Sequence, residues 1–186
     1  MLFRSENILK AKLEILDGAA YDAPLILCRD DKLLAGVQLH SDRKVYYYSV
    51  SKKDCDVYAS GVKTVDNSIT FTINYEGGKI AAQINCLGEH NVKNALAAFC
   101  VGLALDIPPE DIVKGIAQFK PEGLRQNVTV IDGVTYIVDC YNAAPDSMKA
   151  SLSVLSQAQA EGKRICVLGD MLELGKNSKT DRKSVV

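Results

Sequence analysis

The stretch from Val134 to Gly175 constrains the fold most strongly, because its pattern is strand, helix, strand. Val134–Val138 is a continuous apolar and β-branched run, which is typical of a strand buried on both faces of a parallel sheet. Pro145 ends any preceding helix, and Asp146 and Ser147 offer N-cap oxygens for the next one. Gly162 is the expected C-cap of that helix, and a second apolar run, Arg164–Leu168, follows it. A strand, crossover helix and strand of this length predict two parallel strands with a right-handed connection. The expected fold class is therefore α/β.

Polar side chains follow both of these strands. Asp139 comes directly after the first strand, with Tyr141 and Asn142 behind it, and Asp170 and Glu173 follow the second strand. Open α/β sheets bind ligands beyond the carboxyl ends of their strands, so we expect these side chains to share one rim. A carboxylate there can accept two hydrogen bonds from the vicinal hydroxyls of a ribose. The alternative is that Asp139 only caps the following turn, a common use of aspartate.

Composition indicates a globular chain with neither a nucleic-acid nor a membrane signature. The 186 residues are 47% hydrophobic and 24% charged, the net charge is −1, and no basic stripe is present. No apolar run is long enough to span a bilayer, and no signal peptide is visible. Six cysteines are scattered without a C-x-x-C pair, which favours small hydrophobic residues in a reduced, cytosolic protein over disulfides or a metal site.

The region before residue 123 predicts a helix, a β-rich middle and two further helices. Glu6–Leu16 has apolar residues at helical spacing, and the later helices are expected at Asn91–Leu105 and Pro109–Phe119. The expected strands are Leu25–Cys28, Lys44–Val50, Val57–Val65, Ile69–Tyr75 and Lys79–Asn85. The last two of these strands flank Glu76-Gly77-Gly78, a hairpin turn signal. The pattern then breaks at Lys120–Arg125, where we place a domain boundary between residues 122 and 123.

The start of the helix at Asn91–Leu105 has residues suited to recognising a base. Asn91 is a good N-cap candidate, and Asn94 lies three residues on, so both amides point the same way. An amide donates and accepts hydrogen bonds at once, which suits the edge of an adenine. The alternative is simple capping by Asn91, with Asn94 exposed.

Both termini have features of foreign sequence. Residues 2–5 and 180–184 can be encoded by DNA segments that are reverse complements over almost their whole length, as an adapter read from both sides would be. We therefore expect residues 1–5 and 180–186 to be non-native, with 6–122 and 123–179 as the two genuine domain segments. Unrelated codons at the two ends would contradict this hypothesis.

Several of these stretches together resemble the Mur ligase family. The stretches are AKLEIL at 11–16, GEHNVKNALAA at 88–98, Gly-Leu-Arg at 123–125, DCYNAAPDSM at 139–148 and VLGDMLELG at 167–175. The HNxxNAL run marks the wider family, and the last two stretches are similar to its D-alanyl-D-alanine-adding branch. The resemblance implies the back half of a central ATPase domain, a mixed sheet with helices, followed by the start of a Rossmann-like C-terminal domain.

The resemblance also implies a reaction. Members of this family use ATP and Mg²⁺ to phosphorylate a carboxylate, after which an amine attacks the acyl phosphate and phosphate leaves. The implied partners are a UDP-N-acetylmuramoyl-tripeptide and D-alanyl-D-alanine. The implied parent is a monomeric, cytoplasmic enzyme of peptidoglycan synthesis, with no nucleic-acid partner and no membrane insertion.

Individual residues acquire roles from the same resemblance. His90, Asn91 and Asn94 correspond to the run that contacts adenine. Arg125 corresponds to an arginine that reaches the ATP phosphates, and Asp139 to the aspartate that holds the ribose.

Further implied roles concern the metal and the substrates. Lys12 corresponds to a family lysine that CO₂ carbamylates, which turns a cation into an anion able to help bind the magnesium site. The residues implied to face the dipeptide and the peptide substrate are Tyr141, Asn142, Asp170 and Glu173.

Departures from the family pattern limit what this chain does alone. The phosphate-binding loop G-x-x-G-K-[ST] and a magnesium-binding glutamate lie upstream of everything present here, so we expect the chain to be inactive by itself. Ala144 stands where the family usually has asparagine, and Cys140 where serine is usual. Two rivals stay open: another amide ligase of the superfamily, such as a diaminopimelate- or lysine-adding ligase or folylpolyglutamate synthase, and a non-catalytic nucleotide-binding module.

Overall fold

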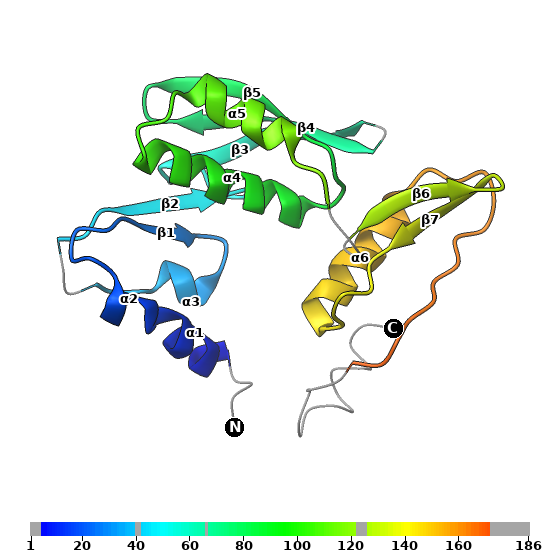
Figure 1. The fold of residues 1–186 in the computed structure, drawn as a ribbon, viewed down its shortest axis with the longest axis horizontal. Helices are drawn as coiled ribbons and strands as arrows, with labels where there is room; N and C mark the ends of the chain where they lie inside the picture. Colours follow the sequence, from blue (N-terminus) through cyan, green and yellow to red (C-terminus); the bar gives the residue numbers. More distant parts are fainter. Residues whose placement is uncertain (1–4, 40–41, 66, 122–125, 172–186) are drawn as a thin grey trace. The chain divides into compact units, whose positions relative to one another are not determined.

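The computed structural model describes residues 5–39, 42–65, 67–121 and 126–171 (Figure 1). The chain divides into two compact units. Unit 1 comprises Met1–Asn85 and Glu89–Phe119, and unit 2 comprises Cys86–Gly88 and Lys120–Val186. The boundary predicted between residues 122 and 123 falls on residues outside the described ranges and stays a prediction.

Unit 1 contains a five-stranded mixed sheet in the order β1-β2-β3-β4-β5 (Figure 1). β1 (Leu25–Cys28) and β2 (Val45–Ser49) pair in parallel, and β2 pairs in parallel with β3 (Val57–Val65). β4 (Ser68–Tyr75) and β5 (Gly78–Ile84) continue the sheet in antiparallel order. Each strand lies within one residue of its predicted range, and the mixed sheet with helices confirms the predicted α/β class.

Alternation along β4 explains which face of the sheet is buried. Ile69, Phe71 and Ile73 are buried, whereas the polar residues between them are only half-buried. Successive side chains of a strand point to opposite faces, so this pattern turns the apolar residues toward the helices. Gly77, at φ 96°, makes the tight turn into β5, since residues with a side chain rarely adopt that conformation.

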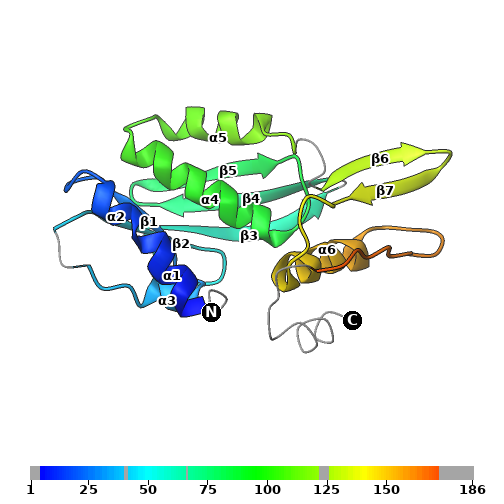
Figure 2. The same cartoon turned by 60° about the horizontal axis from the view of Figure 1, so that its bottom comes forward.

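Two helices cover the apolar face of this sheet (Figure 2). α4 (Glu89–Ala104) contacts β1, β2, β3 and β5, and α5 (Pro109–Gln118) packs against α4 and β5. Phe99 is fully buried, and its ring centroid lies 5.3 Å from that of Tyr75. Gly102 permits close approach of α5, because a Cβ at this position would lie 2.5 Å from Ile112 Cδ1.

The N-terminal helix is shorter than predicted. In place of one helix over Glu6–Leu16, the structure has α1 (Ser5–Leu13) and α2 (Ile15–Gly18), separated at Glu14. The amide of Asp17 bonds to the Glu14 carbonyl three residues back, which tightens the chain at this point. A short helix that was not predicted, α3 (Lys32–Ala35), follows β1 and is capped by the carboxylate of Asp31.

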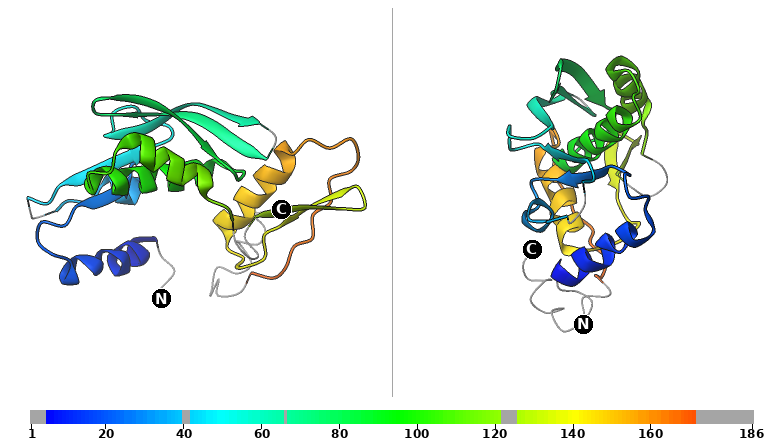
Figure 3. Two further views of the ribbon diagram at one scale, coloured as in Figure 1. Left: turned by 45° about the horizontal axis from the view of Figure 1, so that its top comes forward. Right: turned by 90° about the vertical axis from the view of Figure 1, so that its left-hand side faces the viewer.

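Among its described residues, unit 2 contains an antiparallel ribbon and one helix (Figure 3). β6 (Asn127–Ile131) pairs with β7 (Val134–Val138) across a turn in which Asp132 and Gly133 both have positive φ. Such two-residue turns match the twist of a hairpin. α6 (Pro145–Gln157) follows, and it starts at the proline, before the N-caps predicted at Asp146 and Ser147.

The predicted parallel pair in unit 2 is wrong. β7 is a strand, but its partner is β6, and Arg164–Leu168 forms no strand, with Val167 93% exposed. A hairpin partner lies two residues away, whereas a parallel partner requires a long crossover and cover on both faces. In the described part of this unit, β7 therefore pairs with its neighbour in the chain, β6.

The ends of α6 also differ in detail from the sequence pattern. Its N-cap is Ala144, and the predicted capping residue Ser147 instead accepts a hydrogen bond from the Ala144 amide. The helix stops at Ala158 rather than at Gly162. Val154 is its buried residue, and the described residues include no helix long and apolar enough to cross a membrane.

Candidate functional site

The first turn of α4 is where the sequence predicted adenine recognition. The helix begins at Glu89, so Asn91 lies inside the first turn and the prediction that it is the N-cap is wrong. Gly88, at φ 92°, permits the sharp change of direction that starts the helix earlier. The predicted capping function therefore does not explain why an amide occupies position 91.

The two asparagine amides of this turn lie together. Asn94 Nδ2 donates to Asn91 Oδ1 at 3.4 Å, a long bond, with Asn91 half-buried and Asn94 exposed. His90 is half-buried on the same turn. The spacing of three residues thus produces the predicted cluster, which offers amide donors and acceptors at one point of the surface.

A carboxylate near α4 organises the carboxyl ends of β1 and β2. Asp30, just after β1, accepts hydrogen bonds from Ser49 Oγ at 2.5 Å, from Ser51 Oγ at 2.6 Å and from the Val50 amide at 2.9 Å. Ser49 is fully buried, and its own oxygen accepts the amides of the next turn. The sequence alone gives no signal for this role of Asp30 as a hub of hydrogen bonds, because the donors come from the end of the neighbouring strand and the loop after it.

The electrostatics of this hub reach α4. Burial alone would raise the pKa of Asp30, but the three hydrogen bonds and the charge of Lys93 hold the pKa below its ordinary value. Lys93 lies between Asn91 and Asn94 in sequence and is also 3.9 Å from Glu89. Lys93, on the amide-bearing turn of α4, therefore contributes to the lowered pKa of Asp30, although less than the three hydrogen bonds do.

Lys12 lies exposed in the last turn of α1, in unit 1. Arg125 and Glu173, which the sequence also predicted as site residues, lie outside the described residues.

The predicted ribose-binding residue, Asp139, follows β7 in unit 2 and is exposed. Ser151 Oγ on α6 donates a hydrogen bond to Asp139 Oδ2. Tyr141, Asn142 and Asp170 are also exposed. The common rim predicted for these residues required two parallel strand ends, and the second strand is not present at Arg164–Leu168.

Neither a metal-binding cluster nor a disulfide is present among the described residues. No group of three or more His, Cys, Asp or Glu side chains there could hold a metal ion. The six cysteines are free thiols; Cys86 and Cys100 are buried, as predicted for small hydrophobic residues, whereas Cys140 and Cys166 are exposed.

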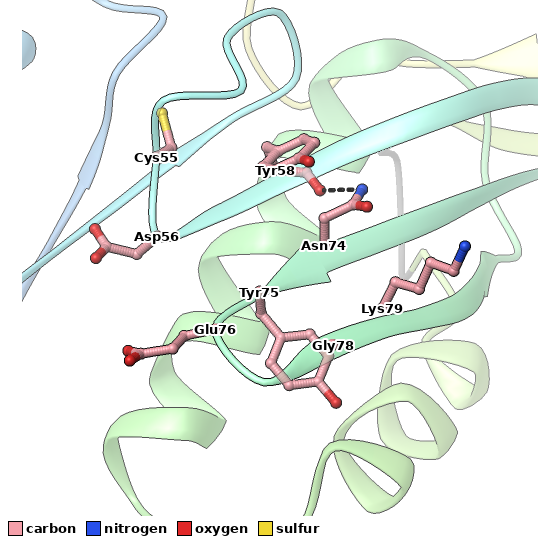
Figure 4. Close-up of a pocket in the computed structure, with 8 residues that line it drawn as sticks. All are labelled: Cys55, Asp56, Tyr58, Asn74, Tyr75, Glu76, Gly78 and Lys79. Carbon is pink, nitrogen blue, oxygen red and sulfur yellow. Dashed lines mark hydrogen bonds between the residues drawn. The ribbon is translucent and has the colours of Figure 1, made fainter.

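A hollow of about 550 Å³ lies on unit 1 (Figure 4). Its lining comes from β3, β4, β5 and the adjoining loops: Cys55, Asp56, Tyr58, Asn74, Tyr75, Glu76, Gly78 and Lys79. The amide of Asn74 is used within the sheet, since it donates to the Tyr58 carbonyl at 3.3 Å and to Ser60 Oγ at 2.8 Å. None of the site residues predicted from the sequence lines this hollow.

Comparison with protein families gives two matches along the chain. The family model described as Mur ligase middle domain matches residues 3–102. The one described as Mur ligase, glutamate ligase domain matches residues 125–186.

Known proteins of this kind are similar over most of the chain. It is 37% identical over 179 residues to the UDP-N-acetylmuramoyl-tripeptide–D-alanyl-D-alanine ligase of Bacillus subtilis (strain 168), covering 96% of this chain and 38% of that protein. The ligase of the same name from Treponema pallidum (strain Nichols) is 44% identical over 88 residues, 47% of this chain and 19% of that protein.

Solved structures agree with the sequence matches. MurF from Acinetobacter baumannii superposes with a TM-score of 0.88 at 30% identity, covering 97% of this chain and 39% of that one. The present chain thus spans well under half the length of these relatives. Two family models and a shared fold lead to the same conclusion: the chain belongs to the Mur ligase family.

Proposed function

We propose that this chain is part of an ATP-dependent ligase that joins D-alanyl-D-alanine to a UDP-N-acetylmuramoyl-tripeptide in peptidoglycan synthesis. The observation that carries the proposal is the 37% identity over 179 residues to a ligase of that name. Since the chain spans 38% of that relative, the activity belongs to the full-length protein. We further propose that this protein is a cytoplasmic monomer.

The chemistry of the described residues fits part of a nucleotide site. In this proposal the amides of Asn91 and Asn94, with His90 beside them, bind the adenine edge, because amides match its donors and acceptors. Asp139 accepts hydrogen bonds from the ribose hydroxyls, and its exposed carboxylate is available for this role. Arg125 is proposed to neutralise the phosphates. ATP supplies the phosphoryl group that activates the substrate carboxylate.

The described residues do not by themselves fit a magnesium site. They contain no group of three acidic, histidine or cysteine side chains, so no Mg²⁺ ligand is assigned among them. Lys12 remains our candidate for carbamylation, because it corresponds to the family lysine that CO₂ modifies, and it lies on α1. Carbon-13 NMR of the full-length protein with labelled bicarbonate tests this: a carbamate signal is expected, and its persistence in K12A would contradict the assignment.

The substrate-facing residues are proposed from the loops after β7 and around residue 170. Tyr141, Asn142 and Asp170 are exposed and carry hydrogen-bonding groups suited to a dipeptide or a peptide carboxylate. Glu173 is proposed for the same role. In this proposal, substitutions here raise KM for D-alanyl-D-alanine or for the UDP-linked substrate more than KM for ATP.

The experiment that tests the function uses the full-length gene product. Phosphate release is measured with ATP and the UDP-linked tripeptide, in the presence of D-alanyl-D-alanine or of single amino acids. Turnover is expected only with the dipeptide. Turnover with diaminopimelate, lysine or glutamate instead would identify another amide ligase, and ATP binding without any turnover would favour a non-catalytic module.

The 186-residue chain serves as a second arm of this experiment. We expect no ligation by the purified chain, because its sequence has no phosphate-binding loop with the pattern G-x-x-G-K-[ST]. Measurable ATP-dependent ligation by this chain would contradict the proposed assignment of roles.

A further inference from the structure

One hydrogen bond in unit 2 connects the proposed ribose-binding residue to the neighbouring helix. Asp139 lies just past the end of β7, and Ser151 lies on α6, twelve residues further along the chain. The hydroxyl of Ser151 donates to Asp139 Oδ2. A hydrogen bond to an ionised acceptor is stronger than one between neutral groups, so this contact restricts the carboxylate.

The same hydroxyl has a second acceptor. Ser151 Oγ also lies 3.0 Å from the carbonyl oxygen of Ser147, one helical turn back. A serine hydroxyl has a single proton, so it donates to only one of the two acceptors at a time. Helical serines commonly donate to the carbonyl four residues back, so Ser151 has a partner even when the carboxylate moves away.

The bond leaves the carboxylate able to bind a ligand. An ionised aspartate has about four lone-pair positions, and one hydroxyl occupies one of them. Asp139 is exposed, so solvent reaches the side chain that carries the remaining positions. A ribose that donates two hydroxyl protons therefore finds an acceptor whose orientation is already restricted.

We infer that Ser151 is a positioning residue, which orients the carboxylate of Asp139 for the ribose hydroxyls of ATP. The inference rests on the proposed function, because it requires Asp139 to bind the ribose. Without Ser151 the carboxylate samples more rotamers before binding, and that loss of preorganisation weakens nucleotide affinity. The chemical step is unchanged, because Ser151 has no part in it.

The chain contains a matched control on the same helix. Ser156 is exposed and donates to the Ser153 carbonyl at 2.8 Å. Its hydroxyl thus makes the same kind of helix-internal bond, but its acceptor is a backbone carbonyl and not the carboxylate of Asp139. Alanine is a better helix former than serine, so neither S151A nor S156A is expected to unfold α6.

The test compares S151A, S151T and S156A in the full-length ligase, with kcat and KM measured for ATP and for 2′-deoxy-ATP. For S151A we expect KM for ATP to rise about three- to tenfold, as one hydrogen bond contributes. The preference for ATP over 2′-deoxy-ATP should shrink by a similar factor, with kcat within about twofold of wild type. S151T retains a hydroxyl and should restore both values, and S156A should match wild type.

Several outcomes would overturn the inference, and they separate it from the proposed function. If D139A raises KM for ATP but S151A does not, Asp139 binds the nucleotide and Ser151 does not position it. If S151A and S156A change KM alike, the effect belongs to the helix and the inference fails. If wild type and D139A both have the same KM for ATP as for 2′-deoxy-ATP, Asp139 does not bind the ribose. The inference about Ser151 is then wrong as well.

Discussion

Units 1 and 2 both contain apolar strands, but the strands of unit 1 contain buried residues and those of unit 2 are largely exposed. Ile73 on β4 has no exposed surface, whereas Val134 on β7 is 52% exposed. In unit 1 the helices α4 and α5 cover one face of a five-stranded sheet. In unit 2 the ribbon of β6 and β7 has two strands, and an isolated two-stranded hairpin is marginally stable in water.

An apolar pattern is therefore enough to form a strand but not to bury it. Burial requires a second layer, and the stabilisation follows the apolar area removed from water, about 25 cal/mol per Å². Unit 1 has that layer within the described residues. We therefore expect perturbations of unit 1 to cost more than equivalent perturbations of unit 2.

The largest expected effect comes from emptying the core of unit 1. Phe99→Ala should lower the free energy of unfolding by about 3–5 kcal/mol, because the side chain is fully buried against the sheet. Urea denaturation followed by circular dichroism measures the change. The matched test removes the same two methyl groups from one buried valine in each unit: Val92→Ala in unit 1 should cost more than Val154→Ala in unit 2, which should cost about 1–2 kcal/mol. Equal losses for the two valine variants would contradict the expected difference between the units.

Thiol reactivity compares the two units without any substitution. Burial raises the pKa of Cys100 to about 12 from an ordinary 9.0, whereas Cys140 and Cys166 of unit 2 are exposed. At about pH 8 a maleimide should label the exposed pair roughly a hundredfold faster or more, as resolved by peptide mass spectrometry. Comparable labelling of Cys100 would show that unit 1 opens readily.

The raised pKa of Cys100 also sets the direction of a pH effect. The folded thiol holds its proton more tightly than the unfolded one, so its contribution to stability is complete below about pH 9. That contribution is lost as pH rises from there toward 12. Replacing Cys100 by alanine should flatten this alkaline loss.

A smaller effect is expected from the two aspartates that follow strands. Asp30→Asn should destabilise unit 1 by about 1–3 kcal/mol, because an amide presents N–H groups to donors that now bond to a carboxylate. Asp139→Asn, at an exposed site, should cost less than about 0.5 kcal/mol. Thermal unfolding of both variants makes the comparison.

The pH dependence of the stability difference between wild type and D30N tests whether the charge of Asp30 is responsible for it. The pKa of Asp30 is held below 3.8 in the folded state, so the stabilisation is present above about pH 4 and is lost as pH falls through the folded pKa. The gap between wild type and D30N should therefore narrow in acid. A gap that stays constant to low pH would mean that the charge is not involved.

The smallest effects come from two glycines in the helices of unit 1, and they should have opposite signs. A methyl group at Gly102 would lie 2.5 Å from Ile112 Cδ1, so Gly102→Ala should destabilise by about 1 kcal/mol after the gain in helix propensity. Gly115 has nothing within 4 Å of its would-be Cβ, and Gly115→Ala should stabilise by up to about 1 kcal/mol. Thermal melts distinguish the two, and a shared sign would contradict the close packing of α4 on α5.

The strands of unit 1 could be predicted from the sequence because the signals for them involve only neighbouring residues. Alternation along β4 and the Glu76-Gly77-Gly78 turn act over a few residues, and the five strands were placed within one residue. The cluster of Asn91 and Asn94 followed from helical spacing in the same way. The capping assignment of Asn91 failed because Gly88 started the helix two residues early.

Contacts between segments that are distant in the chain were harder to predict from the sequence. The run at Val134–Val138 is a strand, but its choice of β6 over Arg164–Leu168 depends on competition between partners at different distances along the chain. The hub at Asp30 requires the end of β2 beside β1, and the Ser151 contact requires α6 beside the end of β7. No spacing in the chain encodes these contacts, since they join segments that approach only after folding.

The linear sequence therefore carries the family and the individual elements, because motifs, turns and periodicity are properties of neighbouring residues. Folding in three dimensions sets which strands pair, which faces lose water and which donor meets each carboxylate. The physical reason is that hydrogen-bond pairing and burial depend on all segments that compete for the same partner or surface, and that competition is settled only when they meet.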